Sequence, residues 1–471
     1  MSCIANNVIP KGFCVGCGAC VNSESNTGID EMSLNSIGQF EPVLTSIDPK
    51  ASSLADKVCP FSDDSLSESQ LGDLLFSDNE NHDDRIGRFD SVFVGNAGDN
   101  NKFRMQGSSG GLTNWLLSVM LERGLVDAVV VVGNAISEDS LYSYRIVENP
   151  NELAGAAKSK YYPIEMSRVI DLMRKSDKRY AFVGVPCFIK AIRNLCLLDP
   201  DLNKRIIYCI ALVCGHLKST GYTEYLAAQM NVLPDNIKGI DFRVKIEGEP
   251  ANRYATEVIA SDRVEQRNVF DLDGTDWGLG FFKYKSCDYC DDVAGEVADI
   301  TFGDAWLPRE VKDWKGNNIV ISRNPDITKL LEEESVVGGI KLRESSPDEF
   351  YLSQSANYRH KIDGLLHRLA IAKEKGEWTP QKRVSQKGKR ISMPKSRKRA
   401  LEARVILRDR SHNLFRTIRD SGDSRLFNIR MLPDIIYYHY FSGTLMKYMA
   451  KEFVKLIRKI YLKSKKRYNK K

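Results

Sequence analysis

Three closely spaced cysteines near the start of the chain are the residues whose chemistry is easiest to read. Cys14, Cys17 and Cys20 are separated by two residues each, in the run FCVGCGAC. The bacterial ferredoxin run has this spacing, and its last cysteine, which precedes a proline, ligates the other cluster. No cysteine follows nearby here, but a remote Cys-Pro pair begins at Cys59. The four cysteines together predict one 4Fe–4S site.

Zinc binding and disulfide bonds are the competing interpretations of these cysteines. Zinc ligands usually come as separated C-x2-C pairs, so the unbroken triplet favours an iron–sulfur cluster. No N-terminal segment combines a basic region, an apolar stretch and a small-residue cleavage site, as a secretory signal does. We therefore expect a reducing cytoplasmic location, where disulfides are rare.

Four more cysteines stand where they could act together: Cys187, Cys214, Cys287 and Cys290. The first two end predicted strands, and the other two form a C-x2-C pair. Cysteines at the carboxyl ends of neighbouring strands converge on the side where α/β folds place ligands. The pattern alone suits zinc nearly as well as iron and sulfur, and the N-terminal set favours a second cluster. Cys196 and Cys209 lie within a predicted helix and strand, which indicates core residues.

Two glycine-containing turns could hold a phosphate or a ring. The turn QGSSGGLTNW precedes an apolar helix, and helix starts bind anions through free N–H groups. Its candidate residues are Ser108, Ser109, Gly110, Gly111 and Thr113. It matches no glycine-rich nucleotide motif, so a plain helix cap is an equal alternative. In TFGDAW, Gly303 and Asp304 follow a strand, where the aspartate could meet a hydroxyl or ring N–H, or merely occupy a turn.

The elements that must position these residues are those of a mixed α+β or α/β protein. From about residue 90 strands alternate with helices, which predicts a parallel or mixed sheet covered on both faces. From about residue 238 consecutive strands without helices predict an antiparallel part. We expect the following divisions: a ferredoxin-like module (1–62), a solvated linker (63–88), a central catalytic domain with the second cysteine set and the two turns (89–345), a helical extension (346–379) and a basic helical tail (380–471).

Charge is distributed unevenly along the chain. Residues 380–471 contain 27 Lys and Arg against 6 Asp and Glu, a net +21, and the rest of the chain carries a net −15. Near its end, one helical face is apolar and the other basic: Met449, Phe453, Leu456 and Ile460 against Lys447, Lys451, Lys455 and Arg458. Such a helix suits an anionic membrane, here the inner face, or an acidic partner. Docking on the chain's own acidic body is the alternative. Nucleic acid is not expected, because no binding motif is present.

Seven motifs in order make the chain similar to the coenzyme F-420 hydrogenase/dehydrogenase beta-subunit family over residues 11–345. They are CVGCGAC, SSGG, KSKYY, GVPC, VCGH, CDYC and ADITFGDAW. The resemblance implies a flavin-binding iron–sulfur protein, with FAD held by the SSGG and FGD turns. It also implies a second 4Fe–4S cluster on Cys187, Cys214, Cys287 and Cys290. Lys160 would line the flavin pocket, where its charge could stabilise the anionic reduced flavin.

One departure from the family shapes the functional prediction. Relatives with a ferredoxin module usually carry cysteines for two clusters in it, whereas this chain has them for one, followed by CPFS. That resembles bacterial members associated with cell-surface polysaccharide biosynthesis. We therefore predict an oxidoreductase that moves electrons between a ferredoxin or reduced deazaflavin and a small-molecule or sugar-linked substrate. The alternatives are an electron-transfer subunit that feeds a partner enzyme, and a non-redox metal-binding module in polysaccharide assembly.

Overall fold

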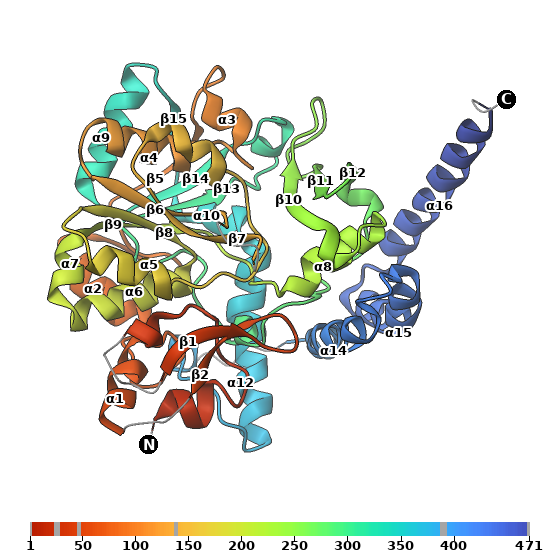
Figure 1. Cartoon of the computed structure of the whole chain (residues 1–471), viewed down its shortest axis with the longest axis horizontal. Coiled ribbons are helices and arrows are strands. Elements are labelled where there is room, and N and C mark those ends of the chain that lie inside the picture. The colour runs from red at the N-terminus through yellow and green to blue at the C-terminus, as the bar shows by residue number, and fades with distance from the viewer. Residues whose placement is uncertain (1, 23–28, 45–48, 136–139, 387–392, 469–471) are drawn as a thin grey trace.

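The centre of the molecule is a sheet of eight strands (Figure 1). It is seen in a computed structural model that describes residues 2–22, 29–44, 49–135, 140–386 and 393–468. In sheet order the strands are β15 (Lys341–Glu344), β5 (Ser91–Asn96), β14 (Asn318–Ser322), β13 (Ile300–Asp304), β9 (Ile206–Leu212), β8 (Tyr180–Gly184), β6 (Ala128–Asn134) and β7 (Tyr142–Val147). The middle four, β13, β9, β8 and β6, run parallel, and antiparallel strands flank them. The predicted mixed sheet of an α/β domain is confirmed.

Helices cover both faces of this sheet, as the apolar strands require. In β6, Val129 and Val131 pack against one helical layer, and Ala128 and Val130 pack against the other. The first layer contains α4 (Leu112–Glu122) and α9 (Pro325–Val336), and the second contains α5 (Ser167–Arg174), α6 (Pro186–Leu198) and α7 (Pro200–Arg205). Burial on both faces explains the uninterrupted valine run of β6.

The N-terminal cysteine module packs directly on the second helical layer. It consists of the hairpin β1 (Ile29–Leu34) and β2 (Phe40–Leu44) and the helix α1 (Pro49–Val58). Phe13 and Val15 share one apolar core with Met166 and Leu195 of the central domain. The backbone N–H of Met166 also donates to the carbonyl of Cys17, at 2.9 Å. The module thus shares its larger core with the central domain and adds a small cluster of its own, formed by Ile4, Cys20, Ile29 and Ala55.

The prediction that residues 63–88 form a solvated linker is wrong. This segment folds into α2 (Glu68–Leu75) and the short hairpin β3 (Asn81–Asp83) and β4 (Gly87–Phe89). Ser67 and Gln70 form a capping box at the start of α2, and Leu71 is fully buried. Glu68 is buried beside Lys190, with 3.3 Å between carboxylate and ammonium. These polar residues, which were predicted to be solvated, thus cap a helix and form a buried ion pair.

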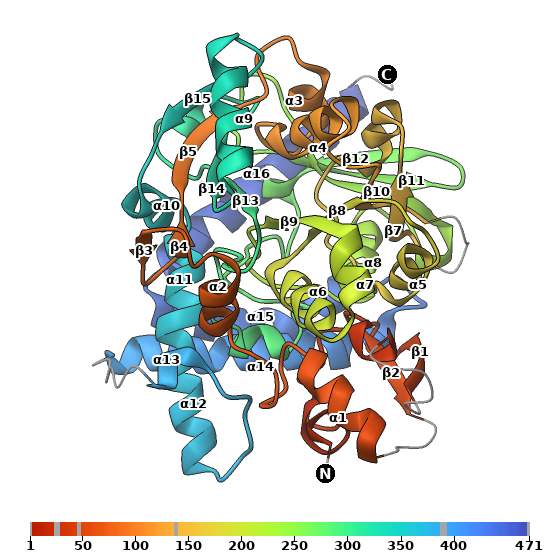
Figure 2. The ribbon, with the colours of Figure 1, turned by 90° about the vertical axis from the view of Figure 1, so that its left-hand side faces the viewer.

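A smaller antiparallel sheet and the C-terminal helices form the other side of the molecule (Figures 1 and 2). The sheet consists of β10 (Ile237–Val244), β11 (Ala255–Ala260) and β12 (Val264–Asn268), next to α8 (Thr220–Gln229). The C-terminal helices are α14 (Lys395–Ile418), α15 (Ser424–Ser442) and α16 (Leu445–Tyr468). Phe415 and Phe427 from α14 and α15 are buried against Tyr225 and Phe282. Much of the basic tail is therefore packed on the body.

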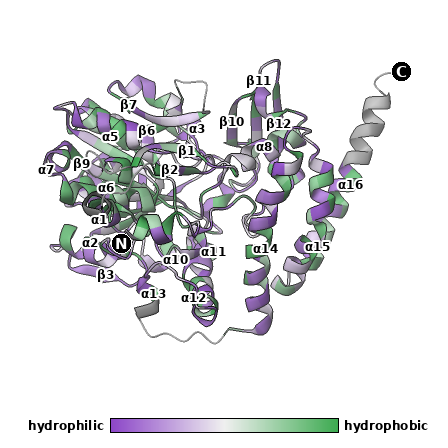
Figure 3. Ribbon diagram, turned by 60° about the horizontal axis from the view of Figure 1, so that its bottom comes forward, coloured by the Kyte–Doolittle hydropathy of each residue, from purple (hydrophilic) through white to green (hydrophobic). Residues whose placement is uncertain are grey.

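The last helix places its basic face on the chain's own acidic loop. Lys455 Nζ lies 2.6 Å from Asp273 Oδ1, and Arg458 lies 3.4 Å from Asp271. The predicted apolar residues point outward instead, and Met449, Phe453 and Leu456 are more than half exposed. Figure 3 shows hydrophobic and hydrophilic residues alternating along the ribbon of α16. The side chain of Ile460 lies outside the described residues. Docking on the acidic body is the interpretation that these ion pairs support. Among the described helices, none is long and apolar enough to cross a bilayer.

Four further helices lead from the edge of the main sheet to α14, and the last three of them lie below the sheet in the view of Figure 2. They are α10 (Pro347–Ser353), α11 (Ser355–Tyr358), α12 (Gly364–Glu374) and the short α13 (Arg383–Gln386). Lys382 and Arg383 belong to the predicted basic tail, yet Lys382 is buried and Arg383 is nearly so. A short helix between β5 and α4, α3 (Lys102–Gln106), completes the elements around the site.

Candidate active site

The structure gathers the first predicted cysteine set at the foot of the second helical layer. Cys14, Cys17 and Cys20 lie in one loop, and Cys59 follows the end of α1. Burial raises the pKa of each thiol, and the charge of the other cysteines of the set raises the pKa of the first three further. The N–H of Gly16 donates to Cys14 Sγ at 3.3 Å. The four predicted ligands are thus close neighbours in a site shielded from water.

The second cysteine set is gathered in the same way. Cys187 opens α6, Cys214 follows β9, and Cys287 and Cys290 lie on one loop. Burial raises the pKa of Cys187, and the other three cysteines raise it further. The N–H of Leu217 donates to Cys287 Sγ at 3.2 Å. All eight predicted ligands therefore fall into the two expected groups.

A fully buried lysine stands beside the second set. Burial alone would lower the pKa of Lys361, but the charges of Cys290 and Cys214 outweigh that effect and raise it. Its Nζ donates to the carbonyl of Asp292 at 2.6 Å. Lys361 therefore supplies positive charge next to buried sulfurs, which favours their thiolate form.

Both sets consist of four cysteines, the donor set of cubane clusters and also of structural zinc sites. Thiols bind either metal centre as thiolates, so the raised pKa of these buried thiols means that they need a positive centre beside them to act as ligands. The choice of an iron–sulfur cluster over zinc rests on the C-x2-C-x2-C spacing of the first set.

The two cysteine sets adjoin each other. The hydroxyl of Ser286, one residue before Cys287, donates to the carbonyl of Cys14 at 3.3 Å. The charge of Cys17 contributes to the raised pKa of Cys187. Burial raises the pKa of Tyr144 on β7, and the charges of Cys187 and Cys17 raise it further, so this side chain is within electrostatic reach of one cysteine from each set.

A first cavity of about 260 Å³ opens beside Tyr144, at the ends of the parallel strands. Its walls are mostly apolar, with Val131, Val183, Phe188 and Phe302 among them, and they include Val15 from the N-terminal cysteine loop. Seven of the eight residues predicted for the flavin line it: Ser108, Ser109, Gly111, Thr113, Lys160, Gly303 and Asp304. Gly110 does not line it, because it is packed against Asn318 and the backbone of β5. An apolar slot with polar groups at its rim fits a flavin ring system.

The SSGG turn is held rigidly by its surroundings. The hydroxyl of Ser108 accepts from the N–H of Ser159 at 2.8 Å, and the hydroxyl of Ser109 donates to the carbonyl of Asn317 at 2.7 Å. Gly111 has a φ of +81°, and a Cβ there would lie 2.5 Å from the carbonyl of Phe103. Both hydroxyls proposed as phosphate contacts thus have protein partners. Their bonds fix the shape of the turn.

Asp304 is paired with an arginine that the sequence did not single out. Arg243 of β10 lies 2.7 Å from Asp304 Oδ2, and the rings of Tyr254 and Trp306 lie 5.0 and 5.2 Å from its guanidinium. Burial lowers the pKa of Arg243, but the charge of Asp304 and neighbouring tyrosines outweigh this and raise it. The only signal in the sequence is a charged residue within the strand IKGIDFRV, at a position that proves to be buried. Arg243 lines the first cavity and fixes Asp304 at its edge.

Two lysines of the KSKYY segment stand at the mouth of this cavity. Lys160 Nζ lies 4.7 Å from the ring centroid of Tyr142, and burial lowers its pKa to about 8. Lys158 has a φ of +78°, unusual for a residue with a side chain. Its Nζ lies 3.1 Å from Asp241, which holds the segment on β10. Lys158 was not among the predicted site residues, because neither its backbone conformation nor its partner is visible in the sequence.

A second, larger cavity of about 900 Å³ adjoins the first. The two share a wall that includes Lys160, Lys218, Arg243 and Asp304. The rest of the lining comes from the smaller sheet, the loop 269–278, α11, α14 and α16. Cys214 of the second set also lines it. The cysteines, the apolar slot and a cavity of substrate size are therefore contiguous.

Comparison with known proteins supports this reading of the central domain. The family described as coenzyme F420 hydrogenase/dehydrogenase, beta subunit, matches with its N-terminal part over residues 92–171 and its C-terminal part over residues 177–348. These two ranges cover more than half of the chain and contain the second cysteine set and the first-cavity turns. The N-terminal cysteine module and the C-terminal helices lie outside them.

Individual relatives come from methanogens. An uncharacterized protein of Methanocaldococcus jannaschii is 26% identical over 251 residues, which are 52% of this chain and 84% of that protein. The coenzyme F420-dependent sulfite reductase of the same organism is 24% identical over 262 residues, which are 52% of this chain but only 37% of the reductase. A chain of the F420-reducing [NiFe] hydrogenase complex from Methanosarcina barkeri is 16% identical with a TM-score of 0.49, covering 64% of this chain and 99% of that one.

Proposed function

Because the chain belongs to the coenzyme F420 hydrogenase/dehydrogenase beta-subunit family, we propose that it is an iron–sulfur flavoprotein oxidoreductase. The family places it among F420-linked oxidoreductases and electron-transfer subunits. Our proposal is that it moves electrons between a redox partner, a reduced deazaflavin or a ferredoxin, and an organic substrate. The name of one relative, an F420-dependent sulfite reductase, agrees with deazaflavin as the partner.

The contiguity of the two cysteine sets with the first cavity is the observation that supports this proposal. Tyr144 and Val15 line the cavity, and the charges of Cys17 and Cys187, one from each set, raise the pKa of Tyr144. The hydrogen bond from Ser286 to the carbonyl of Cys14 holds the sets against each other. A metal site with only a structural role would not need two such sets beside an apolar slot.

We propose a place for each cofactor. One 4Fe–4S cluster would be held by Cys14, Cys17, Cys20 and Cys59, and the other by Cys187, Cys214, Cys287 and Cys290. FAD would lie in the first cavity, against the rigid SSGG turn. When bound, the clusters supply one-electron transfer and the flavin links it to two-electron chemistry.

The side chains at the first cavity would orient and stabilise the flavin. Lys160 would place a positive charge at its mouth, and Arg243 holds Asp304 at its edge. The N-terminal module and the second helical layer bury both cysteine sets, which keeps water from the proposed clusters.

The second cavity favours an enzyme with its own substrate over a subunit that only feeds a partner. It adjoins the first cavity through Lys160 and Arg243 and is of the size of small-molecule sites, about 300–1,000 Å³. A pure electron-transfer subunit has no need of such a cavity. We infer a small organic substrate, and the resemblance to members in cell-surface polysaccharide biosynthesis makes a sugar-linked one the class to test.

Purification of the full chain without oxygen tests the proposal. We expect a brown protein with about eight irons and one flavin per chain, as two cubane clusters and FAD require. Addition of reduced deazaflavin or reduced ferredoxin should bleach the flavin absorbance. A colourless protein that contains zinc, with neither iron nor flavin, would overturn it.

A further inference from the structure

The second cavity is lined by many more cations than anions. Its basic residues are Lys160, Lys218, Arg243, Arg253, Arg404 and Lys451, and its carboxylates are Asp276 and Asp304. Asp304 is already paired with Arg243, and Arg253 pairs with Glu249 at 3.4 Å near the surface. The interior of the cavity is therefore lined by more basic side chains than carboxylates can pair with.

Two of these cations come from the C-terminal helices and lack an acidic partner. Arg404 of α14 donates to the carbonyl of Trp277 at 3.3 Å, and neither it nor Lys451 forms an ion pair with any residue in the described part of the chain. Lys451 of α16 lies over the ring of Phe270, 5.3 Å from its centroid. Other cations of α16 behave differently, since Lys455 is paired with Asp273. Paired cations hold the helices in place, whereas Arg404 and Lys451 face the cavity unpaired.

Buried imidazoles in the same wall also lack partners. His216 is 6% exposed and His360 is 4% exposed. Nε2 of His216 and both ring nitrogens of His360 form no hydrogen bond within the described structure. His360 Nε2 lies 3.4 Å from Asp288 Oδ1, in an orientation that forms none. Buried polar nitrogens are normally satisfied, so these indicate a ligand that would accept or donate hydrogen bonds here.

We propose that the second cavity binds a phosphate or diphosphate group of an organic molecule, held by Arg404 and Lys451. A phosphate group carries about −1.5 to −2 charges at pH 7, which matches the unpaired cations better than a single carboxylate does. Arginine and lysine side chains are the usual partners of phosphate oxygens. The proposal rests on the proposed function only in taking this molecule to be the substrate.

Aromatic side chains provide a surface for the rest of the molecule. Trp277, Trp306 and Tyr254 line the cavity between the basic residues. The indole of Trp277 packs against His216, with 4.3 Å between ring centroids. Aromatic faces beside cations suit a ligand with a flat or sugar-like part next to its phosphate.

The anion contacts are an addition of this chain to the family's site. The family match ends at residue 348, and both Arg404 and Lys451 lie beyond it. α14 and α15 are anchored through Phe415 and Phe427, and α16 through Lys455, so their cations stand at fixed positions in the wall. The C-terminal helices thus select the substrate class.

Titration of inorganic pyrophosphate into the full chain at low salt, followed by calorimetry, tests this site. The double variant Arg404→Gln/Lys451→Gln should bind about tenfold more weakly or worse, because two charge-assisted contacts are lost. The matched control Arg416→Gln/Lys447→Gln removes one charge from each of the same two helices at exposed positions. It should bind as the unmodified chain does. Absence of saturable binding, or equal weakening in both double variants, would overturn the proposal.

Two further measurements separate this proposal from others. Iron and flavin contents are determined for every variant, so a failure of the redox proposal shows in the metal analysis while the pyrophosphate titration stands by itself. Vesicles of phosphatidic acid and phosphatidylcholine serve as a second probe. Binding to vesicles without binding of free pyrophosphate would overturn an enclosed small-molecule site and assign the charge to a lipid surface.

Discussion

Cys59 and Cys3 lie near each other, so both thiols are candidates for the fourth ligand of the N-terminal set. Burial raises the pKa of Cys59 to about 12, and the charge of Cys3 is among the further causes. Cys3 is buried among the same apolar residues. Only Cys59 has the Cys-Pro context of a ferredoxin ligand.

The substitution Cys59→Ser is expected to remove the first cluster and leave the second. Iron should fall to about half, because each cubane holds four irons. The control Cys3→Ser changes the neighbouring thiol and should keep the full iron content, as measured by metal analysis of anaerobically purified protein. If the loss of iron follows Cys3 instead, the ligand assignment is wrong.

The buried positive charge of Lys160 should lower the free energy of unfolding at neutral pH. Burial lowers its pKa from 10.5 to about 8, so the folded state binds this proton less tightly than the unfolded state. The free energy of unfolding therefore rises with pH between about 8 and 10.5, and the cost is largest below pH 8, at most about 3 kcal/mol. Lys160→Met is expected to melt at a higher temperature than the unmodified chain at pH 7, and at nearly the same temperature above pH 10.5.

The melting temperatures of the two proteins are compared at each pH. Their difference reports on Lys160 because all other titrating groups are the same in both proteins. A difference that does not shrink as the pH rises would show that packing, not charge, distinguishes the two proteins. We expect the more stable variant to be less active, since a costly buried charge at a cavity mouth is typical of a functional residue.

Single residues also show how far sequence reasoning reached. Short motifs, the Cys-Pro context and predicted strand ends were enough to group the cysteines into two sets, and the fold brings the members of each set together. Arg243 and Lys158 were not predicted as site residues, since their roles depend on Asp304 and Asp241, which only the fold brings near. Ser109 looked like a phosphate contact, but its hydroxyl bonds to Asn317, more than two hundred residues away in the chain.

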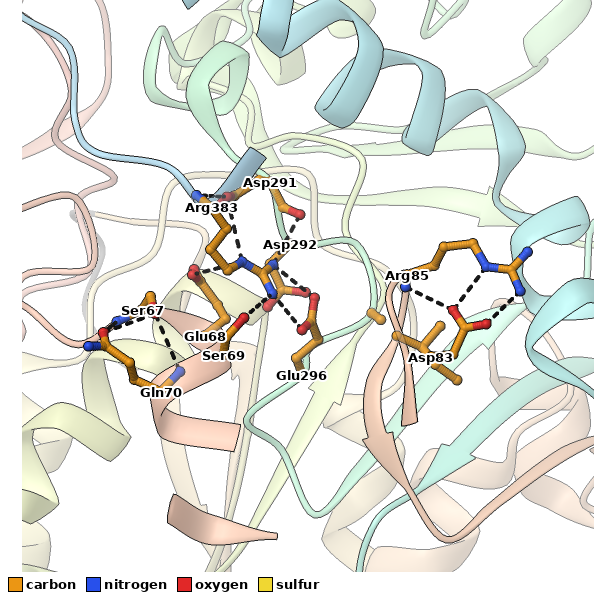
Figure 4. Close-up of polar contacts among 12 residues, drawn as sticks. Ser67, Glu68, Ser69, Gln70, Asp83, Arg85, Asp291, Asp292, Glu296 and Arg383 are labelled. Carbon is orange, nitrogen blue, oxygen red and sulfur yellow. Dashed lines mark hydrogen bonds and ion pairs between the residues drawn. The ribbon is translucent and has the colours of Figure 1, made fainter. Parts of the chain in front are cut away.

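Among the secondary-structure elements, the short helix α13 fixes the loop that carries Cys287 and Cys290. Arg383 of α13 makes two hydrogen bonds to the carboxylate of Glu296, at 2.6 and 2.8 Å, and lies 3.7 Å from Glu68 and 3.6 Å from Asp291 (Figure 4). Asp291 directly follows Cys290. Arg383 therefore joins α2, the cysteine loop and the C-terminal part of the chain through buried charges.

Arg383→Gln is expected to lower the free energy of unfolding by about 3–5 kcal/mol, because it leaves buried carboxylates without their partner. Chemical denaturation measures this change. Arg359→Gln, at an exposed position, is the control and should change stability by less than about 0.5 kcal/mol. A small effect of Arg383→Gln would mean that Lys190 and Lys382 compensate for its charge.

The same cluster explains why the segment 63–88 was misjudged. The serines and acidic residues of this segment are typical of solvated loops when only their sequence neighbours are considered. The strands of the central sheet, by contrast, were recognisable because their apolar pattern lies within each strand. Glu68 is satisfied by Lys190 and Arg383, both far along the chain. Long-range ion pairs leave no periodic signal in a sequence, so an element held by them reads as a loop.

For the whole molecule, the opposite charges of body and tail become internal contacts. The acidic loop that contains Asp271 and Asp273 receives α16, and the apolar faces of α14 and α15 cover α8. The charge asymmetry was visible in the sequence, but the apolar residues of α14 and α15 that bury the interface are spread among many basic residues.

Two truncations separate the roles of the C-terminal helices. A chain that ends at residue 394 should lose its cooperative thermal transition and aggregate, because Tyr225 and Phe282 lose the helices that cover them. A chain that ends at residue 443 keeps α14 and α15, whose Phe415 and Phe427 cover Tyr225 and Phe282, and it should stay folded. Calorimetry and light scattering check both. A folded, monomeric 1–394 chain would contradict this assignment.

The order of the two cysteine sets along the chain has a consequence for how the protein is made. The first set is complete at residue 59, but the helices that bury it, α5 and α6, end only at residue 198. At about 5–20 residues per second, a ribosome needs roughly 7–28 s to make the intervening segment. During that time these thiols lack the cover of α5 and α6, and they are more open to oxidants and to any carrier that delivers iron. The earliest cysteines of the chain are therefore the ones for which the redox conditions during synthesis matter most.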